Sequence, residues 1–226
     1  MCSRETLSVP AARIVDVFGC APPPGYRPRY NIAPTEPILA IRSEGGIRSS
    51  AWLRWDLIPA WTRPGGQHTP PLVNARAERV ATKPSFRYSF RSYRCLVPAD
   101  GYFEWRQEPD RRQPFYVRRP DRDVFAFAGL WARWLNPEAK AVESCAIITT
   151  RANDQLRWLH DRMPVILDQK DYSLWLGADS TPTDLLGLLR PVPDGVLEVF
   201  AVSELVNSAR VDDPRCIEPV STPDEA

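Results

Sequence analysis

The sequence predicts an α+β fold, in which a single domain has a mostly antiparallel β core and short peripheral helices. The 226 residues suit one domain. They contain no internal repeat, low-complexity linker or charge block that would divide the chain. Most apolar runs are short and bounded by turn residues, as in strands, and only a few brief segments show a helical pattern. We therefore expect one domain over residues 1–220 and a tail over residues 221–226.

Glycine and proline residues locate the first elements. Residues 11–18 show the pattern of a short helix, ended by Gly19 and the proline-rich run that follows it. Residues 37–41 and 47–55 are typical of strands. Two consecutive glycines, Gly45 and Gly46, lie between them and predict a hairpin.

The segment from residue 74 to residue 94 is rich in basic side chains and contains a single acid, Glu78. Its basic residues fall three or four positions apart and are Arg76, Arg79, Lys83, Arg87, Arg91 and Arg94. On a helix such steps share one side, and Pro84 must divide the segment into two short helices, the second starting near Pro84 or Ser85. The alternative is a solvated charged face. The scarcity of acids and the interleaved aromatic residues favour a surface that binds a polyanion.

The rest of the chain alternates strand-like runs with turns. Strands are expected at residues 95–98, 102–106, 115–118, 124–130, 144–150, 164–167 and 196–202. Helices are expected at residues 170–176, with Asp168 as the candidate N-cap and Gly177 at the end, and at residues 183–189.

Composition limits the possible functions. Lys plus Arg (29) nearly balances Asp plus Glu (28), so the net charge does not indicate a nucleic-acid partner. Nearly all basic residues are arginines, which suit forked contacts with phosphate, although a GC-rich genome would produce the same bias. No apolar run could span a bilayer and no signal peptide is evident, so we expect a cytoplasmic protein. The five scattered cysteines indicate neither a zinc site nor a disulfide framework, and no metal or cofactor is expected.

Position 2 carries a cysteine with distinctive chemistry once the initiator methionine is removed. A small residue at this position normally permits that removal, and Cys2 would then hold a free amine beside its thiol. Their reference pKa values are about 8 and about 8.5, so both are partly nucleophilic near neutral pH. An aldehyde can condense with the amine to an imine, which the sulfur closes into a thiazolidine ring. The alternative is an incidental cysteine in a frayed terminus.

Four other residues are candidates for chemistry, and each has a structural alternative. Glu104 lies between aromatic residues in a predicted strand, where burial would raise its pKa unless it faces water. His160 lies between a helix-like segment and a strand and is either catalytic or a satisfied structural histidine. Asn74 could cap a helix or orient a sugar hydroxyl or carbonyl. His68 lies in a Gly/Pro loop and is expected to be a solvated surface residue.

Ordered motifs along nearly the whole chain resemble those of a known family. They are Met1-Cys2 and the segments 30–35 (YNIAPT), 54–61 (RWDLIPAW), 74–78 (NARAE), 95–105 (CLVPADGYFEW), 127–131 (FAGLW), 160–165 (HDRMPV) and 202–220. In content and order they resemble the motifs of the SOS response-associated peptidase (SRAP) family.

This resemblance implies a barrel-like core and a monomeric abasic-site sensor that binds single-stranded DNA. It implies that Cys2 forms a covalent link to the ring-opened sugar aldehyde, that Glu104 and His160 transfer protons, and that Asn74 helps to hold the sugar. Removal of Met1 would be autoproteolytic, as expected of a peptidase or lyase-like enzyme. The residues implied to contact DNA are Arg4, Pro34, Trp61, Arg76, Lys83 and Arg162.

Two alternatives and one departure accompany this interpretation. The chain could be an N-terminal-nucleophile cysteine peptidase in which Cys2 attacks an amide. It could also be a non-catalytic module that binds single-stranded DNA. The departure is Ser3, which stands where the family usually has glycine, and a positive φ at that position would strain a serine.

Overall fold

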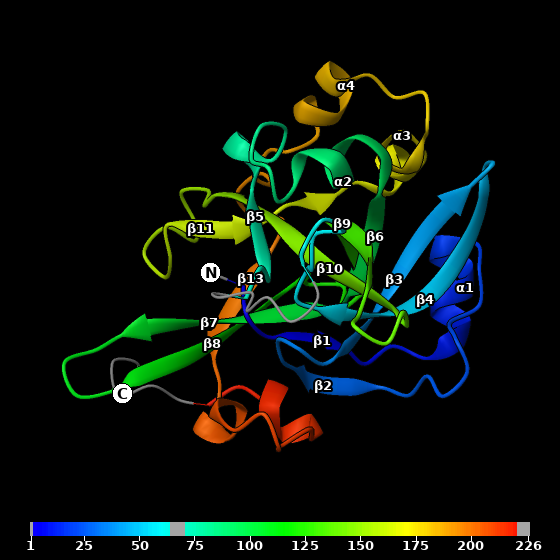
Figure 1. The fold of residues 1–226 in the computed structure, drawn as a ribbon. Helices are drawn as coiled ribbons and strands as arrows, with labels where there is room; N and C mark the ends of the chain where they lie inside the picture. The colour runs from blue at the N-terminus through cyan, green and yellow to red at the C-terminus, as the bar shows by residue number, and fades with distance from the viewer. Residues whose placement is uncertain (1, 64–70, 221–226) are drawn as a thin grey trace.

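The computed structural model describes residues 2–63 and 71–220, and its framework is a closed five-stranded β barrel (Figure 1). The barrel strands are β3 (Pro37–Glu44), β4 (Ile47–Trp55), β6 (Arg94–Ala99), β9 (Phe125–Leu135) and β10 (Ala141–Arg151). β3 pairs with β4 and β6, β9 pairs with β6 and β10, and β10 pairs with β4. Within this ring only the β10–β4 pair is parallel. The predicted α+β fold with a mostly antiparallel, barrel-like core is confirmed.

A second sheet of antiparallel strands carries the start of the chain. Its strands, in spatial order, are β13 (Glu198–Ala201), β8 (Arg112–Arg118), β7 (Gly101–Gln107), β1 (Glu5–Leu7) and β2 (Arg29–Ile32). β7 follows β6 after one residue, so the barrel leads directly into this sheet. Gly101 allows close packing there, because a Cβ at this position would lie 2.2 Å from the Tyr116 ring.

Three short strands extend the barrel sheet near β10. β5 (Asn74–Arg76) runs parallel to β10, β11 (Arg162–Pro164) runs antiparallel to it, and β12 (Ile166–Leu167) pairs with β9. Asn74 is registered with Ile147, and Arg162 with Arg151. Because β5 and β11 both pair with the same end of β10, this end brings together two motifs that are distant in sequence.

The helices are short and lie outside the strands (Figure 1). They are α1 (Ala11–Phe18), α2 (Arg87–Ser92), α3 (Tyr172–Leu176) and α4 (Pro182–Gly187), with 3-10 turns η1 (Ala77–Arg79), η2 (Gln169–Asp171), η3 (Glu204–Asn207) and η4 (Pro214–Ile217). α1 has the predicted bounds, and Gly19 ends it in the left-handed region with φ 73°. Asp168 occupies the N-cap position of η2, but its side chain makes no capping hydrogen bond, so that part of the prediction was wrong.

The basic segment differs from the predicted pair of helices. Asn74 and Arg76 lie in β5, because the segment pairs with β10, and this excludes the role of Asn74 as a helix cap. The second helix, α2, starts at Arg87, close to the predicted start near Pro84 or Ser85. Arg94 is buried in β6 and donates to the carbonyls of Phe90, Trp175 and Gly177 at 2.8, 2.7 and 2.5 Å. The Arg94 guanidinium therefore binds backbone carbonyls and not a phosphate.

Strand alternation on β7 separates two cores. Tyr102 packs in the main core, whereas Phe103 packs in a smaller cluster with Tyr116, Val202, Val206 and Cys216. Glu104, two residues after Tyr102, therefore faces the main core. No helix among residues 2–63 and 71–220 combines the length and the apolar character needed to cross a bilayer. The predictions for Met1, for His68 and for the tail over residues 221–226 lie outside the described residues.

Candidate active site

Cys2 is fully buried and is held by β5. The Asn74 side-chain nitrogen Nδ2 donates to the Cys2 carbonyl oxygen at 2.8 Å. Asn74 Oδ1 is also buried and accepts no hydrogen bond from the described residues. Its unused acceptor therefore lies next to the backbone of Cys2 and suits a hydroxyl of a bound molecule.

Glu104, in β7, supplies a carboxyl group close enough to Cys2 for its charge to affect the Cys2 thiol. Only 4% of Glu104 is exposed, and burial raises its pKa to about 7. Burial also raises the pKa of the Cys2 thiol, and the charges of Glu104 and Glu5 raise it further. Cys2 therefore lies within electrostatic reach of two carboxyl groups, and Glu104 can hold or release a proton near neutral pH.

His160 lies in the loop between β10 and β11, and its ring nitrogen Nδ1 accepts a hydrogen bond from the Arg162 backbone N–H at 2.9 Å. Burial lowers the pKa of His160, so the imidazole is neutral near pH 7 and carries its proton on Nε2. An Asp161 carboxylate oxygen lies 2.8 Å from Nδ1 and would pair with the imidazolium form. Asp161 also raises the pKa of Glu104, which shows that this loop lies close to Glu104.

Two basic clefts meet beside this group. The first, of about 520 Å³, is lined by Arg76, Glu78, Arg79, Arg151, Ala152, Arg157, Asp161 and Arg162. The second, also about 520 Å³, is lined by Pro71, Leu72, Asn74, Arg76, Arg79, Thr82, Lys83 and Phe86. The two clefts adjoin, because Arg76 and Arg79 line both, and Asn74 lines the second. We call the two clefts together the Asn74 channel.

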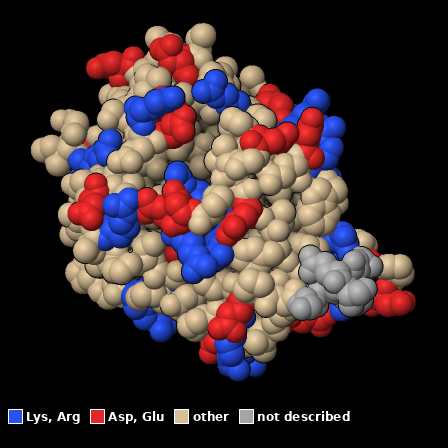
Figure 2. Space-filling view, turned by 180° about the vertical axis from the view of Figure 1, so that it is seen from behind, with Lys and Arg blue, Asp and Glu red and all other residues tan. Residues whose placement is uncertain are grey.

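Local clusters, and not an overall charge, make the Asn74 channel basic. The net charge of the chain is +1, and Figure 2 shows acidic and basic side chains interspersed over one face, with basic ones grouped near its centre. Arg162 is only 8% exposed and is paired with Glu78 at 2.7 and 3.0 Å. Arg76 is exposed on β5, and its side chain makes no hydrogen bond or ion pair with described residues.

Comparison with known proteins identifies the family of the chain. The sequence model of the family described as SOS response associated peptidase (SRAP) matches residues 1–209. The chain belongs to the SRAP family. It is 39% identical over 223 residues to the abasic site processing protein YoqW of Bacillus subtilis, covering 96% of this chain and 99% of YoqW. It is 29% identical to the abasic site processing protein HMCES of Xenopus tropicalis, covering 85% of this chain and 66% of HMCES.

A solved structure has the same SRAP fold. The crystal structure of a protein from Bacteroides thetaiotaomicron superposes with a TM-score of 0.88 at 26% identity, covering 97% of this chain and 100% of that one. The glycine usual in the SRAP motif is replaced by Ser3. Among residues 2–63 and 71–220, the non-glycine residues with positive φ are Thr35, Arg122 and Ala139, and Ser3 is not one of them. The serine therefore carries no left-handed strain.

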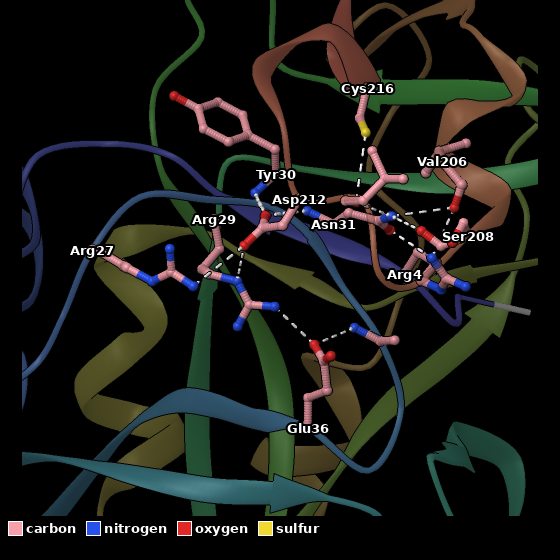
Figure 3. A network of polar contacts seen from close by, with 12 residues as sticks. Arg4, Arg27, Arg29, Tyr30, Asn31, Glu36, Val206, Ser208, Asp212 and Cys216 are labelled. Atoms are coloured by element: carbon pink, nitrogen blue, oxygen red, sulfur yellow. Dashed lines mark hydrogen bonds and ion pairs between the residues drawn. The ribbon is translucent and has the colours of Figure 1, made fainter.

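Arg4, in the first SRAP motif, anchors the end of the domain (Figure 3). Its Nη1 donates to Asn31 Oδ1 at 2.6 Å and to the Val206 carbonyl at 2.8 Å. Asn31 Nδ2 donates to the same Val206 carbonyl at 3.2 Å. Asp212 adds a further link by accepting from the Tyr30 backbone N–H at 2.7 Å. Arg4 thus joins the first SRAP motif to the last, and its contact with DNA stays a prediction.

The other residues implied to bind DNA differ in position. Lys83 lines the Asn74 channel, with its Nζ 5.1 Å from the centre of the Phe86 ring. Pro34 is half-buried in the turn between β2 and β3. Trp61 is 66% exposed and lines a separate cavity with Pro84, Arg87 and Tyr88. Among residues 2–63 and 71–220, no three His, Cys, Asp or Glu side chains gather in a way that could hold a metal ion.

Sequence reasoning missed Glu5, a fully buried carboxyl group in β1. Glu5 is registered with Tyr102, and neither carboxyl oxygen has a hydrogen-bond partner among the described residues. Burial raises the pKa of Glu5 well above its ordinary value, and the charge of Asp100 raises it further. The only sequence signal was its spacing, since Glu5 and Leu7 share one face of a strand.

Glu5 is expected to make the protein less stable as the pH rises. The carboxyl is neutral in the folded protein but ionises near pH 4.5 in the unfolded chain, so the free energy of unfolding falls above that pH. Glu5→Gln removes this ionisation while keeping the side-chain shape. Between pH 5 and pH 8, urea unfolding of wild type should lose more stability than the variant, by up to about 1.4 kcal/mol for each pH unit over which Glu5 stays protonated in the folded protein. Parallel pH profiles for the two proteins would contradict this account.

Proposed function

We propose that this protein senses abasic sites in single-stranded DNA and forms a thiazolidine cross-link between Cys2 and the ring-opened sugar aldehyde, which shields the lesion. The arrangement that supports this best is Cys2 within electrostatic reach of Glu104 and held by Asn74, a residue that lines the basic Asn74 channel. The names of its relatives as abasic site processing proteins also support it. We further propose that residues 1–220 form the functional unit, acting as a monomer in the cytoplasm.

The reaction uses both nucleophiles of an N-terminal cysteine. The neutral amine of Cys2 adds to the aldehyde carbon, and the resulting carbinolamine loses water to give an iminium ion. The thiol sulfur then attacks the same carbon and releases its proton, which closes the five-membered ring and leaves a neutral secondary amine. The net change is one molecule of water lost for each adduct formed.

The buried side chains around Cys2 match the proton transfers that this reaction needs. With a pKa of about 7, Glu104 can protonate the leaving hydroxyl of the carbinolamine and then accept the thiol proton. His160, whose Nδ1 accepts from the Arg162 backbone N–H, can donate a proton from Nε2 to help open the sugar ring. Asn74 Oδ1 can accept a hydrogen bond from a sugar hydroxyl.

Removal of Met1 is a required first step in this proposal, because the Cys2 amine lies in a peptide bond until then. We propose that the site removes Met1 itself, with Glu104 and His160 assisting hydrolysis of that bond. The same residues would then serve both a peptidase activity on the Met1–Cys2 bond and the reaction with the aldehyde. An N-terminal-nucleophile peptidase with other substrates is the competing function, and a non-catalytic DNA-binding module is the third.

One experiment separates the three functions. The protein is incubated with single-stranded DNA containing one abasic site, with the same DNA lacking the site, and with peptides. We expect a protein–DNA species that survives denaturation only with abasic DNA. Peptide turnover without an adduct would support the competing peptidase. Binding to DNA that is lost on denaturation, without peptide turnover, would support the non-catalytic DNA-binding module.

Arg76→Ala should weaken non-covalent binding to single-stranded DNA and flatten its salt dependence. Arg76 is exposed and lines both parts of the Asn74 channel, where a phosphate can reach it. Loss of one phosphate contact should reduce the slope of log K against log salt by about 0.7. Titrations at several salt concentrations measure this slope. Arg190→Ala, at an exposed site outside the channel, is the matched control, and equal slopes for both variants would remove Arg76 from the phosphate contacts.

A further inference from the structure

A second groove lies along α2, close to the Asn74 channel. Three cavities share lining residues: the first has Trp61, Pro84 and Tyr88, the second repeats these and adds Tyr93 and Arg133, and the third continues from Tyr88, Tyr93 and Arg133. The third measures about 600 Å³. We call this continuous surface the Tyr88 groove.

Aromatic side chains form the floor of the Tyr88 groove. Tyr88 is 59% exposed, and its ring centre lies 5.4 Å from that of Tyr93. Tyr93 packs edge-on against Trp131 at 4.8 Å. Trp61, at the other end, is also largely exposed. Exposed rings that are held in place by neighbouring rings suit stacking with nucleic-acid bases.

The charges along the Tyr88 groove favour an anion. The side chains of Arg87, Arg91 and Arg133 line it and make no hydrogen bond or ion pair with any described residue. Of the two acids there, Glu143 is already paired with Arg42 at 3.0 Å, which leaves Glu44. Three available guanidinium groups therefore face one unpaired carboxylate beside the aromatic floor.

The position of the Tyr88 groove suggests its occupant. Lys83 and Phe86 line the Asn74 channel, whereas Pro84, Arg87 and Tyr88 line the Tyr88 groove. A single turn of chain therefore separates the two surfaces. A DNA strand that leaves the channel past Lys83 would meet exposed aromatic rings and arginines on the far side of that turn.

We propose that the Tyr88 groove binds the single-stranded DNA that flanks the abasic site on one side. Bases stack on Tyr88 and Trp61, and phosphates contact Arg91 and Arg133. This inference rests on the proposed function, and it adds a second binding segment whose length sets the preferred substrate.

The test uses single strands that carry tetrahydrofuran, an abasic analogue without an aldehyde, so binding is measured without cross-linking. The strands are extended stepwise on the 5′ side or on the 3′ side. For wild type we expect affinity to rise along one of these two series only. Arg91→Ala/Arg133→Ala should lose that rise and reduce the salt slope by about 1.4, at about 0.7 for each phosphate contact. Tyr88→Ala should weaken binding to the long strand about 5-fold or more.

Two controls keep the result specific. Lys170→Ala/Arg190→Ala removes two exposed positive charges outside both surfaces and should behave as wild type. On the shortest strand, all variants should bind as wild type does. Flat affinity in both series, or equal loss on short and long strands, would overturn the proposal. Since the analogue forms no adduct, failure of cross-linking with natural abasic DNA would instead count against the proposed function.

Discussion

Cys2→Ala is expected to abolish the adduct that survives denaturation, while folding and non-covalent DNA binding persist. Alanine keeps the α-amine but removes the sulfur, so the reaction stops at a reversible imine. Because Cys2 contacts β5 through its backbone carbonyl, the Asn74 hydrogen bond does not require the thiol. Denaturing gels after incubation with abasic single-stranded DNA give the direct measurement.

Borohydride shows which half of the reaction the variant has lost. The reductant should trap the imine of Cys2→Ala as a stable amine, restoring a protein–DNA band that is absent without it. Cys20→Ala is the matched control, because Cys20 lies outside the site and should leave the adduct unchanged. A stable adduct from Cys2→Ala without reductant would mean that another residue is the nucleophile.

Glu104→Gln should slow adduct formation by about 100- to 10,000-fold, the usual contribution of a general acid or base. Glutamine keeps the size and polarity of the buried side chain but cannot give or accept the proton. With the pKa of Glu104 at about 7, its acid form declines above that pH, whereas the amine becomes neutral towards pH 8. The wild-type rate should therefore peak between these values, and the variant should lose the alkaline decline.

Single-turnover rates at several pH values test this, together with binding to the tetrahydrofuran strand. Glu108→Gln is the matched control, since Glu108 lies beyond β7 in the same hairpin and pairs with Arg106 at 2.7 Å on the surface. Binding by Glu104→Gln should stay close to wild type. An equal loss of binding and rate would mean that Glu104 only supports the structure.

The sequence predicted correctly those helix ends and turns that depend only on neighbouring residues. Gly19 ends α1 because glycine adopts a left-handed φ, and Gly45 and Gly46, both with positive φ, turn the β3–β4 hairpin. The predicted helix over the start of residues 74–94 was wrong, because pairing with a strand distant in sequence determines the conformation there. Asn74 and Arg76 are extended because β10 aligns them, and Arg94 is buried because its donors satisfy carbonyls of residues 90, 175 and 177. No helical spacing in residues 74–94 contains that information.

Only part of the candidate site could be predicted from the residues themselves. The aromatic setting of Glu104 left two possibilities, exposure to water or burial with a raised pKa, and Glu104 is buried, which raises its pKa to about 7. The residues grouped around Cys2 came from the family resemblance, since nothing in the spacing of Cys2, Asn74 and Glu104 indicates that they meet. The burial of Glu5 was not predicted, and of the Tyr88 groove only the basic and aromatic character of residues 87–93 was, because the tertiary packing decides which faces of β1 and α2 are covered or open.

The most direct test of the central claim is the mass of the N-terminal peptide before and after incubation with abasic single-stranded DNA. We predict that the active protein begins at Cys2. After incubation its mass should increase by that of the DNA less one water, with amine and thiol of Cys2 both blocked to alkylation. Active protein that retains Met1, or a modification on any other residue, would contradict the account.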